Sequence, residues 1–204
     1  MFTKTLLPDT LRALQLVSSI PEIKESYLAG GTALALRLGH RLSVDLDFFT
    51  KKEFDEEKVK LELENLGNYK HLSNSWQTVL GVVGQTKFSI FNYKYPILDD
   101  FDVFENINIA SLKDIAAMKL LVVSDRGAKR DFIDLYFLNQ EFTFDQILSF
   151  YDQKYGNLRE RMYHIARSLD YFDDADQDRD YKMLIEVSWD DIKKHFRRIA
   201  SNLI

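Results

Sequence analysis

The residues with the clearest capacity for chemistry are two aspartates separated by one residue, Asp45 and Asp47. In an extended strand alternate side chains share a face, so Ser43, Asp45 and Asp47 should point the same way while the apolar residues between them face the core. Two residue rises place the two carboxylates on backbone points about 6.6 Å apart. Charges that close repel unless a cation lies between them, and Mg²⁺ favours one or two carboxylates completed by water and substrate phosphates. The pair is therefore a candidate divalent-metal site.

A pair of glycines, Gly30 and Gly31, stands upstream, between a short apolar strand and a helix expected to begin at Thr32. Glycines at such a turn let a phosphate approach the backbone, and the helix N-terminus offers free N–H donors. By itself an Asp-x-Asp strand favours solvent-facing acids on a one-sided sheet, and the glycines could form an ordinary turn. The turn, the helix and the Ser-x-Asp-x-Asp strand together favour a site that binds phosphate and metal.

One lysine lies at an unexpected place on the predicted helix over residues 111–124. At 100° per residue, Lys119 falls at the centre of an apolar stripe. A lysine there must extend its ammonium group to the surface, pair with an acid or serve a site, and the helix alone leaves all three open. The stripe consists of Leu112, Ile115, Ala116, Val122 and Val123.

Two further acids, Asp131 and Asp134, stand three residues apart near the start of the next predicted helix and share one of its faces. Acids in a first helical turn also complement the helix dipole, which is a purely structural reason for their presence. Their spacing alone does not distinguish a site from helix stabilisation.

These motifs together resemble a known family. The run Gly30-Gly31-Thr-Ala-Leu-Ala-Leu through Arg41-x-Ser43-x-Asp45-x-Asp47-Phe-Phe resembles the first motif of the DNA polymerase beta-like nucleotidyltransferase superfamily, and more narrowly the AbiEii/AbiGii toxin family. Lys119, in Ala-Ala-Met-Lys-Leu, matches a lysine that is essential in that family, and Lys129-x-Asp131-x-x-Asp134-Leu matches its last motif.

The resemblance implies an enzyme that moves a nucleoside monophosphate from an NTP to an acceptor, with Mg²⁺ or Mn²⁺ as cofactor. RNA, and tRNA foremost, is the implied acceptor, and the implied role is that of a toxin neutralised by a separately encoded antitoxin. The alternatives are transfer to an aminoglycoside-like small molecule or a protein hydroxyl, and an inactive fold kept as a nucleotide-binding or interaction module. The implied catalytic residues are Asp45, Asp47, Lys119 and Asp131, with Asp45 and Asp47 as metal ligands; the implied nucleotide-binding residues are Gly30, Gly31, Thr32, Arg41, Ser43 and Asp134.

The sequence departs from the wider superfamily at one position. Polymerase-like enzymes usually carry a third carboxylate on a later strand, but the candidate strand Lys87–Tyr93 offers Ser89 and no acid. Either Asp131 fills that role from a helix or the enzyme works with fewer fixed metal ligands, so the general base stays open.

The secondary structure expected to position these residues is mixed in the first half of the chain and helical in the second. We expect an α/β (α+β) fold, with a small mixed sheet and flanking helices of the nucleotidyltransferase type in residues 1–108. Residues 109–204 should form a helical bundle that completes the active-site cleft. Thr32 should cap its helix, Gly39 should end it, and Gly84-Gln85 should turn a hairpin. The predicted helices are Asp9–Ile20, Thr32–Leu38, Phe54–Leu66, Ser111–Ser124, Lys129–Asn139, Phe144–Tyr155, Leu158–Ser168 and Trp189–Leu203, and the predicted strands are Tyr27–Ala29, Ser43–Phe49, Tyr69–Trp76, Thr78–Val83 and Lys87–Tyr93.

Composition narrows the class of protein. The 204 residues are 46% apolar, enough for one compact domain or two small ones, and no run approaches a membrane span. The absence of cysteine excludes disulfides, thiolate metal sites and a cysteine nucleophile, and fits a cytoplasmic protein. A net charge of −5 argues against non-specific coating of nucleic acid. The basic run 193–198 reads as a solvated helix end, or alternatively, with Arg126, Lys129 and Arg130, as a track for an RNA backbone. The acidic run Asp170–Asp180 is expected to be a solvated loop.

Overall fold

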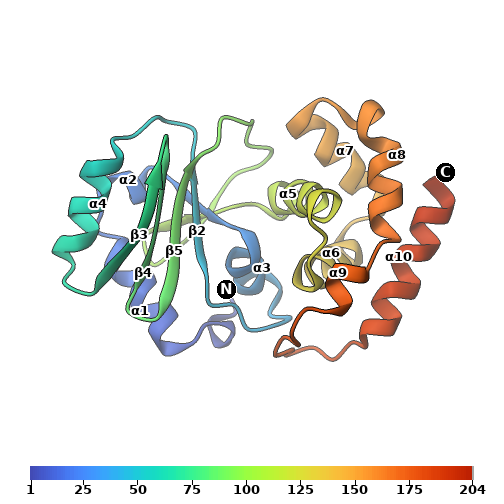
Figure 1. Cartoon of the computed structure of the whole chain (residues 1–204), viewed down its shortest axis with the longest axis horizontal. Helices are drawn as coiled ribbons and strands as arrows, with labels where there is room; N and C mark the ends of the chain where they lie inside the picture. The colour runs from blue at the N-terminus through green and yellow to red at the C-terminus, as the bar shows by residue number, and fades with distance from the viewer. Residues whose placement is uncertain (204) are drawn as a thin grey trace. The chain divides into compact units, whose positions relative to one another are not determined.

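The computed structural model describes residues 1–203, and the chain divides into two compact units. Unit 1 comprises Met1–Tyr95 and Asp100–Ser111. Unit 2 comprises Pro96–Asp99 and the chain from Leu112 onward. Unit 1 carries the sheet and unit 2 is helical, so the mixed α/β fold class is confirmed (Figure 1).

A seven-stranded mixed sheet forms the centre of unit 1, in the order β3-β4-β5-β2-β1-β7-β6. Two neighbouring pairs, β2 with β5 and β1 with β7, are parallel, and the other four pairs are antiparallel. The Gly84-Gln85 hairpin turn between β4 and β5 is confirmed. The strands are β1 (Tyr27–Ala29), β2 (Leu46–Thr50), β3 (Tyr69–Ser75), β4 (Thr78–Val83), β5 (Thr86–Asn92), β6 (Asp102–Phe104) and β7 (Ile107–Ile109).

Helices pack against this sheet within unit 1. Helix α3 contacts β1 and β2, α4 contacts β3 and β4, α1 contacts β5, and α2 contacts β7. The alternation of apolar residues in the strands supplies the core, in which Leu28, Leu46, Phe48 and Ile90 are fully buried. The helices are the 3-10 turn η1 (Thr3–Thr5), α1 (Pro8–Val17), α2 (Pro21–Lys24), α3 (Gly30–Leu38) and α4 (Glu56–Asn65).

Two predictions around the aspartate motif are wrong in detail. Helix α3 begins at Gly30 with Ala29 as its N-cap, so Thr32 is a helical residue and not the cap, whereas Gly39 does end the helix in a left-handed conformation. Strand β2 begins at Leu46, so neither Ser43 nor Asp45 belongs to it. Residues before Leu46 are diverted because the Ser43 N–H donates to the Thr5 carbonyl at 3.1 Å, pairing this stretch with the N-terminal segment.

Further differences have local causes. The first long helix ends at Val17, not at Ile20, and the chain then turns into α2, which begins at Pro21. The hairpin of β6 and β7 was not predicted, because its strands have three residues each and its turn places Glu105 and Asn106, not glycines, at positive φ.

Unit 2 is built around helix α5, which packs against α6, α7 and α8, while α10 packs against α6 and α8. An aromatic cluster of Phe132, Phe172, Trp189 and Phe196 fills part of its core, with ring centroids 5.0–6.0 Å apart. The acidic run is not wholly a loop, because it contains the short helix α9. The helices are α5 (Leu112–Asp125), α6 (Lys129–Glu141), α7 (Phe144–Tyr155), α8 (Leu158–Leu169), α9 (Asp173–Asp176) and α10 (Trp189–Leu203).

Helices of a length and apolar character that could cross a lipid bilayer do not occur within residues 1–203.

Candidate active site

The turn from β1 into α3 is the centre of the candidate site in unit 1. Gly30 has a positive φ of 68°, a conformation that side chains other than glycine rarely adopt. A Cβ placed on Gly30 would lie 3.2 Å from the Asp47 Oδ2 atom. Asp47 is opposite Ala29 in the β1–β2 register, which explains why its carboxylate reaches this turn. The glycine therefore allows the carboxylate to approach the backbone of the turn closely.

Gly31 brings two more predicted site residues to the same turn. A Cβ on Gly31 would lie 2.4 Å from the Arg41 Nη2 atom and 3.3 Å from the Ser43 hydroxyl oxygen. Only 3% of Arg41 is exposed, and its guanidinium also donates to the Leu42 carbonyl at 3.0 Å. A buried guanidinium under a glycine turn supplies fixed positive charge where an anion could approach.

The hydroxyl of Thr32 ties the loop before β2 to the helix. It donates to the Ser43 hydroxyl at 2.9 Å and also contacts the Asp45 carbonyl oxygen. Asp45 thus lies next to the turn through its backbone, although it precedes the strand that carries Asp47. The structure brings together all the residues predicted for this part of the site, which are Gly30, Gly31, Thr32, Arg41, Ser43, Asp45 and Asp47.

Ser89 takes part in the site through a contact with Asp47 that the sequence did not reveal. The parallel register of β2 and β5 places Ser89 beside Asp47, and its hydroxyl donates to Asp47 Oδ1 at 2.6 Å. The sequence identified Ser89 only as the position without an acid. The residue pattern gives the alternation within each strand but not the register between β2 and β5, which creates this contact.

The remaining predicted residues form a second cluster, inside unit 2. The Lys119 ammonium lies 2.8 Å from Asp131 Oδ1 and 2.6 Å from Asp134 Oδ2. Both aspartates are fully buried and the lysine side chain is 7% exposed. Among the three roles open to a lysine in an apolar stripe, pairing with acids is therefore the one seen. Arg126, from the end of α5, adds a bond from its Nε to Asp131 Oδ2 at 3.1 Å.

The charges of this second cluster act together on the pKa of Asp131. Burial by itself would raise the pKa of Asp131, but the charges of Lys119 and Arg126 and the hydrogen bond from Lys119 outweigh it, so that the pKa lies below its usual range. The charge of Asp134 acts in the opposite direction. Asp131 is therefore held as a carboxylate by its two cationic neighbours.

The donor set of unit 1 fits a divalent ion in one particular way. Within residues 1–203, no group of three or more His, Cys, Asp or Glu side chains is placed to hold a metal. Asp47 offers a carboxylate beside the Gly30 turn, and Asp45 stands two residues before it. This suits Mg²⁺, because that ion takes one or two carboxylates and completes its shell with water and phosphate oxygens. The residues thus fit an ion that arrives with a nucleotide.

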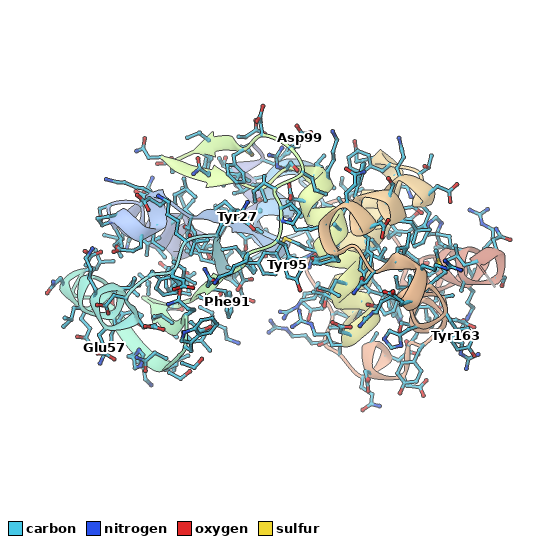
Figure 2. The ribbon with its side chains drawn as sticks, turned by 90° about the horizontal axis from the view of Figure 1, so that it is seen from above. Tyr27, Glu57, Phe91, Tyr95, Asp99 and Tyr163 are labelled. Atoms are coloured by element: carbon cyan, nitrogen blue, oxygen red, sulfur yellow. The ribbon has the colours of Figure 1, made fainter. Side chains whose placement is uncertain are left out.

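The basic run 193–198 lies on α10 and is largely engaged within unit 2. Lys193 pairs with Asp176 at 3.1 Å, Arg197 pairs with Asp170 at 3.3 Å, and Phe196 is fully buried. His195 lies within hydrogen-bonding distance of Asn139, and burial together with the Arg198 charge lowers its pKa. Figure 2 shows Tyr163, on α8, as another side chain of this unit; it is 69% exposed.

Solved structures with a similar fold include a nucleotidyltransferase toxin and an antibiotic-resistance factor. JHP933 from Helicobacter pylori aligns with a TM-score of 0.56 and 19% identity, covering 97% of this chain and 93% of that chain. MenT4, the nucleotidyltransferase toxin Rv2826c from Mycobacterium tuberculosis H37Rv, aligns with a TM-score of 0.56 and 15% identity over 94% of this chain and 80% of its own. The antibiotic-resistance factor ANT(2'')-Ia aligns with a TM-score of 0.55 and 13% identity over 75% and 94%. Together they define the fold as that of a nucleotidyltransferase.

Sequence comparison identifies the family. The family described as "Nucleotidyl transferase AbiEii toxin, Type IV TA system" matches residues 12–103 and 92–202. The chain belongs to this family and is a nucleotidyltransferase, which confirms the resemblance drawn from the motifs. The uncharacterized protein aq_aa25 of Aquifex aeolicus (strain VF5) is 36% identical over 201 residues, which cover 96% of each chain.

Proposed function

We propose that this nucleotidyltransferase moves a nucleoside monophosphate from an NTP to an RNA, with tRNA as the foremost acceptor. The observation that carries the proposal is the convergence of Asp47, Arg41 and Ser43 on the Gly30-Gly31 turn. In the reaction, an acceptor hydroxyl oxygen bonds to the α-phosphorus while the bond to the β-phosphate oxygen breaks, and pyrophosphate leaves with that electron pair. The acceptor proton passes to solvent.

Each residue has a role in this proposal that follows from its chemistry. The turn and the N-terminus of α3 receive the triphosphate, with the Thr32 and Ser43 hydroxyls and the Arg41 guanidinium as donors. Asp45 and Asp47 hold Mg²⁺ or Mn²⁺, which when bound neutralises charge on the triphosphate. For Lys119, Asp131 and Asp134 the family resemblance supports a role in transfer, and within unit 2 the two aspartates hold the Lys119 ammonium in place.

The physiological proposal is a growth-arresting toxin that a separately encoded antitoxin neutralises, as the type IV toxin–antitoxin description of the family suggests. We expect induced expression of the wild-type chain to arrest bacterial growth and expression of Asp47→Asn to leave growth unchanged. Equal growth arrest by both proteins would show that toxicity does not depend on transfer.

The acceptor class can be decided by one labelling screen. Purified protein is incubated with each α-labelled NTP and with total RNA, an aminoglycoside panel or cellular protein, with Mg²⁺ or with EDTA. Label in RNA that requires Mg²⁺ is the expected result. Label in an aminoglycoside alone would replace RNA by a small molecule, an alternative that the likeness in fold to ANT(2'')-Ia brings into consideration.

The metal ligands give the first mutational prediction. Asp45→Asn and Asp47→Asn keep the side-chain shape but remove the charge, so each is expected to reduce the rate of transfer by at least about 100-fold. The single-turnover rate with labelled NTP measures the effect, and circular dichroism checks the fold. Transfer at the wild-type rate by either variant would contradict the assigned role of that aspartate.

The glycine turn gives a second prediction. In Gly31→Ala the added methyl group would meet the Arg41 guanidinium, whose flexible end must shift, so the fold should persist while the donor geometry at the turn is lost. We expect transfer to fall by about 100-fold, the scale of a misplacement near 1 Å. Gly67→Ala serves as a control for backbone strain, because its methyl group meets nothing within 4 Å although the φ of 77° strains an alanine there. Equal activity of the two variants would show that the turn does not bind substrate.

A further inference from the structure

The carboxylate of Asp47 has two oxygens in different surroundings. Its Oδ1 atom accepts a hydrogen bond of 2.6 Å from Ser89, whereas its Oδ2 atom points to the Gly30 turn. The hydrogen bond from Ser89 restricts rotation of the carboxylate group and leaves its second oxygen facing the turn.

Ser89 is itself held firmly in place. It is 6% exposed and lies in the middle of β5, with Asp47 of β2 beside it on one side and Leu80 of β4 on the other. Its position is set by backbone pairing with both neighbouring strands, so its hydroxyl is a fixed donor. A short hydrogen bond to a carboxylate is of the strong, charge-assisted kind.

Ser89 is uncharged, which affects how the Asp47 carboxylate is held. An acid at this position would stand beside Asp47 and repel its carboxylate unless a cation lay between them. A hydroxyl instead donates to Asp47, so that the carboxylate keeps its orientation when no ion is present. The Asp47 carboxylate is therefore already oriented when an ion binds together with its nucleotide.

We propose that Ser89 is a positioning residue, which directs Asp47 Oδ2 toward the Gly30-Gly31 turn and so sets the affinity of the site for the divalent ion of the NTP. This inference rests on the proposed function, in which Asp47 is a metal ligand. Hydrogen-bond partners of metal ligands commonly change metal affinity by 10–100-fold when removed.

The test measures metal binding apart from activity. Mn²⁺ is titrated into the full-length protein in the presence of a saturating non-hydrolysable NTP analogue, with the analogue alone as the blank, and free Mn²⁺ is followed by its electron paramagnetic resonance signal. We expect Ser89→Ala to weaken Mn²⁺ binding by about 10–100-fold and to raise the Mg²⁺ concentration for half-maximal transfer, with a smaller change in the rate at saturating Mg²⁺. Ser89→Thr keeps the hydroxyl and should restore binding, which a merely structural defect would not allow.

A matched control comes from the same strand. Thr86 also lies on β5 and is buried, but it alternates to the opposite face from Ser89, so Thr86→Val should leave Mn²⁺ binding unchanged. An equal loss in Thr86→Val and Ser89→Ala would overturn the proposal, because the effect would then be general to the strand. If Ser89→Ala does not fold, Ser89→Cys, whose thiol is a weak donor, serves in its place with the same expected loss.

Asp47→Asn separates this inference from the proposed function. Loss of Mn²⁺ binding in Asp47→Asn with wild-type binding in folded Ser89→Ala would overturn the role of Ser89 and leave the metal ligand in place. Wild-type Mn²⁺ binding in Asp47→Asn would overturn the metal assignment, and the role of Ser89 with it.

Discussion

Replacing Lys119 by methionine is expected to destabilise unit 2 by about 3–5 kcal/mol, the usual cost of removing one partner from a buried ion pair. Methionine fills a similar volume, so loss of packing contributes little. What remains is two fully buried carboxylates, Asp131 and Asp134, whose shared cation is gone. Arg126 still reaches Asp131, but its side chain is 56% exposed and its charge is screened by solvent.

The pH dependence of this variant should have the opposite sign to that of the wild type. In the wild type the pKa of Asp131 is lowered, so its contribution to stability is present above the ordinary carboxyl pKa and is lost as the pH falls through the lowered value. In Lys119→Met, burial and the Asp134 charge dominate and raise the pKa of Asp131. The deficit in stability should therefore be largest at neutral pH and should shrink on acidification.

Denaturant unfolding can follow unit 2 selectively, because Trp76 lies in unit 1 and Trp189 in unit 2. In a Trp76→Phe background the fluorescence of Trp189 reports on its contacts with Phe132 and Phe172. Lys113→Met is the control on the same helix, since its pair with Asp99 is solvent-exposed and should contribute at most about 1 kcal/mol. A Lys119→Met protein as stable as Lys113→Met across the pH range would contradict the buried-pair account.

The site illustrates what a sequence pattern can and cannot settle. The stripe on α5 identified Lys119 as anomalous, because a lysine among buried apolar residues requires a reason. It could not choose pairing with acids over the alternatives, since that depends on how α5 and α6 pack. In the same way the Asp-x-Asp spacing identified the candidate metal ligands, but it placed Asp45 on a strand that begins one residue later, at Leu46.

Elements with strong local signals were predicted to the residue, and elements determined by distant contacts were not. The strand Tyr27–Ala29 and the helices Phe144–Tyr155 and Trp189–Leu203 have the predicted bounds. Helix α7 owes its sharp start to a capping box in which Thr143 and Gln146 bond reciprocally to each other's backbone N–H groups. The strand Asp102–Phe104 escaped prediction because Val103 is 68% exposed and the segment pairs with β7, a contact that the local residue pattern does not reveal.

Disrupting a second buried ion pair, Lys154 with Asp114, is also expected to lower the stability of unit 2 strongly. The side chains of Lys154 on α7 and Asp114 on α5 are both fully buried and 2.7 Å apart. Lys154 also donates to the Pro96 carbonyl at 2.7 Å, and the Leu98 N–H donates to both Asp114 oxygens at 3.1 and 3.2 Å. The short segment Pro96–Asp99 belongs to unit 2, although the chain on both sides of it belongs to unit 1. The ion pair binds this segment to α5 and α7.

Lys154→Met is expected to lower the stability of unit 2 by about 3–5 kcal/mol, because Asp114 would be left charged and buried without its cation. Asp114→Asn in the same chain removes that charge while its amide oxygen can still accept from Leu98, so the double variant should recover at least half of the loss. Trp189 fluorescence in the Trp76→Phe background measures both. Lys194→Met serves as the control, since Lys194 is 75% exposed and 3.9 Å from Asp191. If the double variant were no more stable than Lys154→Met, the lost stability would come from the released Pro96 segment and not from an uncompensated carboxylate.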